Sequence, residues 1–288
     1  MRGDGRALFA RGAQLTRPFR QQIELVLSLA KRDLKARYKD SVLGFFWSLL
    51  RPAFLTFILW VVFYKILPNQ FGELPVPYWM HVLVGLLAWN FFLGALTDAT
   101  HSLTINANLL KKVRLDAEVF PISAILANGV HFALAILLVF VLLLVSGIGI
   151  HWGLLLLPVI VVLEAILVLG VAFFLSSLNV YYRDVGSALE LGGMALFYVT
   201  PVIYPLTLAY AKLHEKLGPF WSAAYMLNPA APIIVAVRRV TLYPQGSVEI
   251  PDAKLLLFLG IAAVVAFALL ISGWFVFRRL SRDFADEL

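Results

Sequence analysis

The stretch RQQIELVLSLAKRDLKARYKDSVLGFFWSLLRP, residues 20–52, decides the organisation of this chain. Its apolar side chains recur at spacings of three and four residues, which places them on one face of a helix. That face consists of Ile23, Val26, Leu27, Ala30, Leu34 and Tyr38, and the opposite face carries Arg20, Glu24, Lys31, Arg32, Lys35 and Lys39. Such a helix is typical of one lying in the plane of a membrane surface. From Val42 the chain continues as an apolar segment, so a surface helix leads directly into a membrane span.

Composition indicates an integral membrane protein. Hydrophobic residues make up 61% of the chain and charged residues 14%, against roughly a quarter charged in soluble domains. A span needs about 20 apolar residues. The segments that satisfy this requirement cover residues 43–67, 80–104, 119–147, 153–178, 187–207 and 253–277. We therefore predict an all-α membrane fold with an amphipathic interface helix over 20–41 and a single domain of six transmembrane helices over 42–278.

Basic residues predict the orientation of the spans through the positive-inside rule. About ten Lys and Arg residues precede Val42, and further basic residues follow the second, fourth and sixth spans. The alternate loops, about 68–79 and 148–152, contain none. We therefore expect both termini in the cytoplasm, with tails over 1–19 and 279–288, and the segment 208–252 on the outside.

The segment 208–252 is too apolar for a freely solvated loop. It contains LAYAKLHEKLGPFWSAAYMLNPAAPIIVAVRRVTLYPQG, which is rich in aromatic residues and broken by prolines. We interpret it as short helices that lie on or dip into the outer leaflet. The alternative is a plain extracellular loop with aromatic residues at the membrane interface.

Two polar side chains are expected near the middle of adjacent spans. Glu164 lies in the fourth span and His131 in the third, with Asn128 one turn away. An ionisable group at this depth is costly and often functional, so a proton relay or substrate site is one hypothesis. We favour the other, an interhelical polar pair that fixes packing. Asn90 and Asp98, on the second span, leave the same two alternatives open.

Arg51 lies about two turns into the first span, beside Pro52. Its long side chain could reach back to the inner headgroups, as arginines near span ends do. It could instead line a pore entrance and bind a phosphate. Both interpretations remain open from the sequence.

Motifs for ATP binding and common catalytic chemistry do not occur in the sequence. There is no GxxxxGK[ST] phosphate loop, no HExxH, no GxSxG and no EF-hand loop. The chain has no cysteine, and its five histidines lack ligand spacing. We therefore expect no metal, cofactor or covalent chemistry in this chain. A polytopic glycosyl- or acyltransferase, or a flippase without an ATPase, remain the alternatives from other classes.

A set of motifs in a fixed order resembles a known family. RDLKARYKDSVLGFFWSLLRP is followed by NANLLKKVRLDAEVFP, LNVYYRDVG, TPVIYP and LNPAAPIIVAVRRV, with spans between them. This order resembles the permease subunit of type-2 ABC exporters, in the branch that exports O-antigen, teichoic acid and related polysaccharides. The resemblance covers about residues 21–283. An exporter of small lipophilic compounds from the same superfamily is the alternative within transport.

The resemblance implies the partners and the location. Such permeases are homodimers in the bacterial inner or cytoplasmic membrane and bind two copies of a separate ATP-binding subunit, which holds ATP and Mg. The substrate would be a lipid-linked glycan, and nucleic acid would have no part.

The resemblance also implies roles for particular residues. Residues 20–39 would be the interface helix and 105–118 the coupling loop. The expected residues for coupling to the ATPase are Arg32, Lys35, Arg37, Asn108, Leu109, Lys111, Lys112 and Arg114. The expected outer gate, in re-entrant helices of the segment 208–252, includes Asn228 and Pro229. Spans one and five would line a channel, for which we expect Arg51, Phe57, Trp60, Tyr64, Tyr198 and Tyr204. Aromatic faces suit a sliding polymer because they stack on sugar rings without a fixed hydrogen-bond pattern.

Overall fold

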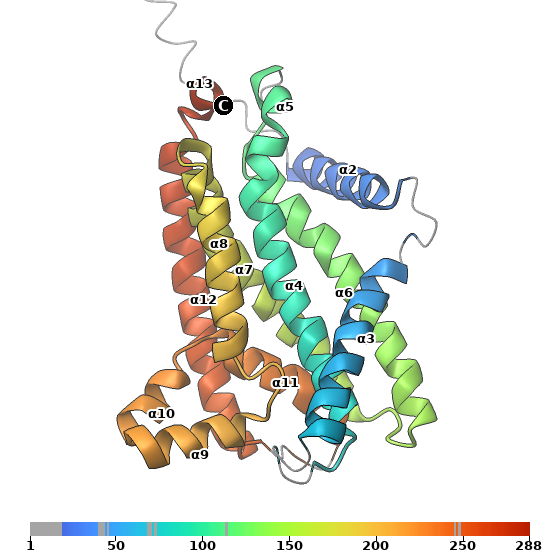
Figure 1. The fold of residues 1–288 in the computed structure, drawn as a ribbon. Helices are drawn as coiled ribbons and strands as arrows, with labels where there is room; N and C mark the ends of the chain where they lie inside the picture. The colour runs from blue at the N-terminus through green and yellow to red at the C-terminus, as the bar shows by residue number, and fades with distance from the viewer. Residues whose placement is uncertain are drawn as a thin grey trace, which may run out of the picture.

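The structure, a computed structural model, is a bundle of long helices (Figure 1). It describes residues 19–39, 44, 46–67, 71, 74–112, 115–244, 246 and 249–288, apart from the side chains of 285 and 286. One end of the bundle carries α5 (Ala107–Lys112) and α13 (Phe284–Glu287), and we call it the α5 end. The opposite end carries α9 (Leu206–Leu217), α10 (Pro219–Tyr225) and α11 (Ala230–Leu242), and we call it the α11 end.

Within the described residues, five helical segments are long and apolar enough to cross a membrane. They are α3 with η1 (Phe46–Ile66), α4 (Tyr78–Ile105), α6 (Val119–Val145), η2 with α7 (Trp152–Tyr181) and α12 (Asp252–Leu280). The pair α10 and α11, bent by 72°, makes a sixth candidate if it is counted as one broken span. The chain is therefore a multi-pass, all-α membrane protein, as the sequence predicted.

The predicted fifth span, 187–207, is only partly helical. Helix α8 covers Asp184–Val199, and its 16 residues are fewer than the roughly 20 that a span needs. The helix ends at Thr200 because Pro201 follows, and a residue before proline is driven to extended backbone; its ψ is 141°. The chain still passes along α8 from the α5 end toward the α11 end, and it completes this passage without helix over residues 200–205 (Figure 1).

Helix α4 forms the centre of the bundle. Most of its residues are buried, and it packs against α3, α6, α7, α8 and α11. The close approach of α7 and α12 depends on two glycines: a Cβ on Gly273 would lie 2.4 Å from the carbonyl oxygen of Gly170. Small residues of this kind bring helices together in membranes, where no hydrophobic driving force acts between helices.

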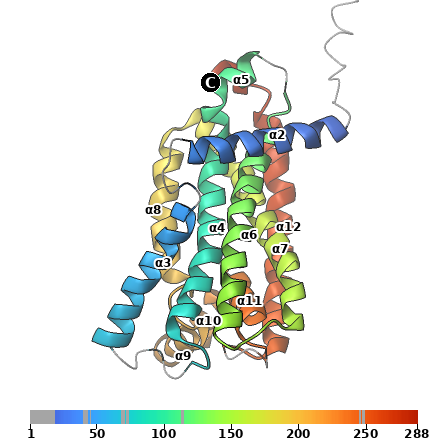
Figure 2. The same ribbon diagram turned by 90° about the vertical axis from the view of Figure 1, so that its right-hand side faces the viewer.

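Helix α2 (Phe19–Tyr38) lies across the α5 end of the bundle and packs against α6 (Figure 2). The residues that pack on the bundle are Leu25, Val26, Leu29 and Ala30. Ile23 and Leu27 remain 44% and 45% exposed. Of the predicted apolar face, Val26 and Ala30 pack on the bundle whereas Ile23 and Leu27 remain exposed, and Leu25 and Leu29, which lie outside that face, complete the contact. The predicted tail, except Phe19, and residues 40–43 lie outside the described residues.

The segment expected outside the membrane contains three helices, and the interpretation as a plain loop is wrong. Gly218, with a φ of 93°, ends α9, and Pro219 begins α10. Every residue of α11 except Arg239 is buried. The expected short helices are confirmed, but α11 is an inner part of the fold and does not lie on its surface.

The predicted C-terminal tail, 279–288, is folded against the bundle. Helix α13 packs on α5 and α7. Phe284 is only 1% exposed and contacts the rings of Phe277 and Tyr181, with centroid distances of 5.5 and 6.3 Å. The tail therefore contributes to the core at the α5 end.

Candidate coupling surface and translocation path

Helix α2 is linked to the predicted coupling loop at two points. Gln22 Nε2 donates a hydrogen bond of 2.8 Å to Asp116 Oδ2, and Arg32 Nη2 donates one of 2.8 Å to Asn106 Oδ1. Asn106 precedes α5 and Asp116 follows it. A force applied to α5 would therefore reach both halves of α2.

The predicted coupling residues form an exposed basic surface around α5. The side chains of Lys35, Asn108, Lys111 and Lys112 are exposed, whereas Leu109 packs inward against the cluster around Phe284. Arg114 lies outside the described residues. Exposed charges of one sign suit recognition of an acidic partner surface. The coupling role of these residues stays a prediction.

The C-terminal turn of α2 is anchored on α4 and α6. Arg37 forms an ion pair with Asp98, and Asn128 Nδ2 donates a hydrogen bond of 2.7 Å to the same carboxylate. The Tyr38 hydroxyl lies 2.5 Å from His131 Nδ1. The polar residues expected near the membrane interior thus hold the surface helix in place.

The expected pair of Glu164 and His131 does not form. His131 bonds Tyr38 instead. Glu164 is 1% exposed, and its Oε2 has no hydrogen-bond partner among the described residues. The prediction was wrong because similar depth in two spans does not fix the direction in which each side chain points.

Arg51 lines a polar cavity between α2, α3, α4 and α6. The cavity has a volume of about 260 Å³, and Arg37, Asn90, Asn128 and His131 also lie on its wall. The arginine is exposed and sits near the start of α3. The structure therefore places it among polar side chains and not against lipid alone.

Three aromatic residues predicted to line a channel form a ladder on one face of α3 and η1 (Val61–Ile66). The centroids of Phe57 and Trp60 lie 6.2 Å apart, and those of Trp60 and Tyr64 lie 5.8 Å apart with nearly parallel rings. Lys65 Nζ lies 5.5 Å from the Trp60 centroid. Phe57 and Tyr64 are both 57% exposed. The ladder offers a flat surface on which sugar rings could stack.

The other two predicted channel residues differ from each other. Tyr198 projects from α8 and is 69% exposed. Tyr204 lies beyond α8, and its hydroxyl donates a hydrogen bond of 2.8 Å to the Tyr198 carbonyl and lies 3.3 Å from the Tyr225 hydroxyl. Tyr204 thus ties the end of α8 to α10, and its role in a channel stays a prediction.

Helices α3 and α8 flank α4 on the same side of the bundle (Figures 1 and 2). They are also lightly buried: α3 buries only Pro52 and Thr56, and α8 buries only Gly186 and Gly193. A Cβ on Gly193 would lie 2.7 Å from Leu93 Cδ1, so the glycine lets α8 approach α4. Both helices leave large apolar side chains for a further surface to cover.

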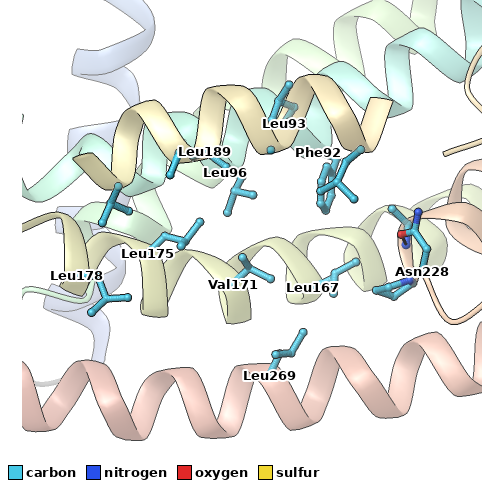
Figure 3. A pocket seen from close by; sticks show the side chains of 17 residues that line it. Phe92, Leu93, Leu96, Leu167, Val171, Leu175, Leu178, Leu189, Asn228 and Leu269 are labelled. Atoms are coloured by element: carbon cyan, nitrogen blue, oxygen red, sulfur yellow. Dashed lines mark hydrogen bonds between the residues drawn. The ribbon is translucent and has the colours of Figure 1, made fainter. Parts of the chain in front are cut away.

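An apolar groove lies behind α8. Figure 3 shows it between α4, α7, α8 and α12, running from Leu178 to Asn228. Its volume is about 590 Å³, and nearly all of its lining is aliphatic. Helix α8 is thus incompletely packed, which leaves it room to shift relative to α7.

The α11 end is held by a buried polar network that sequence analysis missed. Arg238 is 0% exposed; its Nε lies 3.0 Å from Glu249 Oε1, and its Nη1 donates to His81 Nε2 at 2.6 Å. Because arginine only donates, His81 Nε2 accepts, and His81 Nδ1 then donates to the Tyr243 hydroxyl at 2.8 Å. Burial raises the pKa of the Glu249 carboxyl, and Arg238 opposes that shift.

The same network fixes the non-helical segment after α8. Arg238 Nη2 donates to the Pro201 carbonyl at 2.8 Å, and the Leu206 N–H donates to Glu249 Oε2 at 2.8 Å. Arg238 belongs to the segment 208–252, which the sequence analysis expected on the outside. The apolar residues on either side of the Arg238–Arg239 pair were the signal that this segment is buried.

The two predicted gate residues lie at the bend between α10 and α11. Asn228 Nδ2 donates to Thr200 Oγ1 at 2.9 Å, and its Oδ1 accepts from the Ala230 N–H at 3.1 Å. Asn228 therefore joins the start of α11 to the end of α8, next to Pro229. Their function as a gate stays a prediction.

The fold and these surfaces define a polytopic membrane protein with an amphipathic helix across one end, a basic loop beside it and lightly buried helices next to a central one. Residues 24–242 match the family described as ABC-2 type transporter, so the chain belongs to this family of transporters. The chain is similar to the O-antigen export system permease protein RfbA of Klebsiella pneumoniae, with 30% identity over 269 residues, 92% of this chain and 95% of the relative. It is also similar to the protein of that name from Myxococcus xanthus, with 30% identity over 276 residues, 96% and 99% of the two chains.

Proposed function

We propose that this chain is the permease of an ATP-driven exporter that moves a lipid-linked polysaccharide across the bacterial inner membrane. The glycan class is that of O-antigen, teichoic acid or capsule. The observation that carries the proposal is the similarity to O-antigen export permeases over 92–96% of the chain. The exposed aromatic ladder of Phe57, Trp60 and Tyr64 supports a carbohydrate substrate.

The proposed assembly is a homodimer with two ATP-binding subunits, which hold ATP and Mg. The lightly buried α3 and α8 support a second copy, because together they leave an exposed apolar face on one side of α4. The two copies would enclose a path lined by these helices. Both termini would lie in the cytoplasm, together with α5.

The proposed coupling begins at the basic surface of α5. Hydrogen bonds of Gln22 and Arg32 would transmit a movement of the loop 105–118 to α2. The ion pair of Arg37 with Asp98 would carry it to α4. Helix α3 follows α2 in the chain, so displacement of α2 would shift the aromatic ladder.

A pull-down from native membranes in mild detergent tests this proposal. We expect a soluble protein bearing GxxxxGK[ST] to be recovered in amounts near those of the permease. Charge reversal in Lys112→Glu should reduce this recovery and the export of glycan to the cell surface, whereas Lys254→Glu, at the opposite end of the bundle, should leave both unchanged. Recovery of the permease alone, under conditions that preserve a control ABC complex, would contradict the proposal.

A further inference from the structure

The polar wall of the cavity between α2, α3, α4 and α6 carries two arginine side chains. The polar residues that line the cavity are Arg37, Ser48, Arg51, Asn90, Asn128 and His131. Asp98, the acidic partner of Arg37, is not among the lining residues. Because Arg37 is paired with Asp98, the unpaired positive charge on the wall, within the described part of the chain, is that of Arg51.

Two of these side chains make no hydrogen bond or ion pair with any other residue that the structure describes. They are Arg51 and Asn90, both exposed, on α3 and α4. Each lies inside a helix that is long and apolar enough to span a membrane. A guanidinium in such a segment is costly unless water, a lipid headgroup or a ligand meets it. The arrangement thus leaves a cation without its counter-ion at the edge of a preformed polar space.

The volume of about 260 Å³ limits what can enter. It accommodates a phosphate or diphosphate group, while a glycan chain is too large. The guanidinium of arginine matches the oxygens of a phosphate group with paired N–H donors, and the Asn90 amide supplies a further donor. Apolar residues, including Pro52, Leu87 and Phe91, form another part of the wall and suit the first carbons of a lipid chain.

We propose that this cavity binds the phosphate group of a membrane lipid, with Arg51 as its principal ligand. The phosphate group could come from two sources. One is the diphosphate of the lipid that carries the glycan, and for this source the inference rests on the proposed function. The other source is the phosphate of an ordinary phospholipid. Because Arg37 of α2 shares the wall and is anchored by Asp98, a movement of α2 would open or close the site.

The test is a titration of the purified full-length permease, without ATP or partner, in a non-ionic maltoside detergent. The probes are undecaprenyl diphosphate and undecaprenol, which differ only in the diphosphate, and the matched pair phosphatidylglycerol and diacylglycerol. The variants are Arg51→Gln, Asn90→Ala and the control Arg20→Gln. Arg20 is basic like Arg51, but it lies on α2, far from the cavity. Its side chain is 91% exposed and pairs with Glu24. Thermal unfolding of each variant shows that it is folded.

We expect undecaprenyl diphosphate to bind roughly tenfold or more tightly than undecaprenol, as a charge-assisted contact predicts. Arg51→Gln should remove this difference, Asn90→Ala should reduce it, and Arg20→Gln should preserve it. The same Arg51-dependent difference between phosphatidylglycerol and diacylglycerol would identify phospholipid as a source. The proposal is overturned if the phosphate confers no difference, or if neither cavity variant alters it.

Because binding is measured on the permease alone, its failure is separate from that of the exporter assignment. An intact ATPase complex that exports glycan, combined with no phosphate preference, would remove the site and keep the function. Phosphate binding by a permease from which no ATP-binding partner is recovered would keep the site and remove the proposed function.

Discussion

Arg238 and Arg51 both lie among apolar helices, but their surroundings are opposite. Arg238 is fully buried at the α11 end, where Glu249, His81 and the Pro201 carbonyl occupy its donors. Arg51 is exposed near the α5 end and has no partner among the described residues. A charge whose partners all lie inside the protein holds the structure together. A charge left open beside a cavity is available for a ligand.

The largest expected effect comes from removing the counter-charge of Arg238. Glu249→Leu leaves a buried guanidinium without its carboxylate, which costs about 3–5 kcal/mol in the free energy of unfolding. We expect a strong fall in the thermal midpoint in detergent and a loss of monodisperse protein. Asp252→Asn is the control, since the Asp252 side chain that pairs with Arg239 is 50% exposed and such a pair contributes about 1 kcal/mol or less. Equal thermal midpoints for Glu249→Leu and Asp252→Asn would show that the buried polar network does not stabilise the α11 end.

A smaller effect is expected from crowding the same network at Gly85. A Cβ there would lie 2.5 Å from the Val202 carbonyl oxygen and 3.6 Å from Arg238 Nη1. Gly85→Ala should push the segment 200–205 away from α4 and destabilise the fold by about 1–3 kcal/mol. The matched control is Gly260→Ala, where no atom lies within 4 Å of the added Cβ. A thermal midpoint for Gly85→Ala at or above that of Gly260→Ala would mean that the segment 200–205 moves aside without lowering the free energy of unfolding.

At the α5 end we expect function to change more than stability. Asp98→Asn weakens the ion pair with Arg37, whose side chains are 37% and 41% exposed, so the cost in unfolding free energy should stay near 1 kcal/mol or less. The anchor of α2 on α4 is nevertheless loosened. We expect ATP hydrolysis by the assembled complex to continue while export of glycan falls. Parallel losses of both activities would instead indicate general damage to the permease.

The smallest effect on stability is expected at the aromatic ladder. Tyr64→Ala removes a ring that is 57% exposed and stacks on Trp60, so the thermal midpoint should change little. The amount of exported glycan per cell should fall if this face contacts the polymer. Phe54→Ala on the same helix removes a 62% exposed ring outside the ladder and serves as the control. Equal export by Tyr64→Ala and Phe54→Ala would show that the aromatic ladder does not line the proposed translocation path.

The long spans could be predicted from the sequence because their signal is local. The runs 80–104, 119–147, 153–178 and 253–277 lie within or close to α4, α6, α7 and α12. Amphipathic spacing also predicted α2. The predicted end of the fifth span was wrong, because hydropathy does not reveal that Pro201 stops a helix inside an apolar run. That the C-terminal tail docks on the bundle through Phe284 could not be predicted from hydropathy.

The connections between the candidate site residues could not be predicted from the sequence. Lys111, Lys112, Phe57 and Tyr64 have exposed side chains, and their roles in coupling and in a channel stay predictions. The partner of His131 is Tyr38, 93 residues away in the chain. The partner of His81 is Arg238, 157 residues away. No local pattern contains such pairs.

The sequence by itself determined that this chain is a helical membrane protein, where most of its spans lie and which family it belongs to. These properties follow from hydropathy, spacing and the order of motifs, all of which are local in the chain. Only the tertiary structure decided which arginine is structural and which is open, and that α2 is tied to both the loop 105–118 and α4. The reason is physical: the state of a buried charge depends on groups that meet it in space, and helix packing alone brings them together.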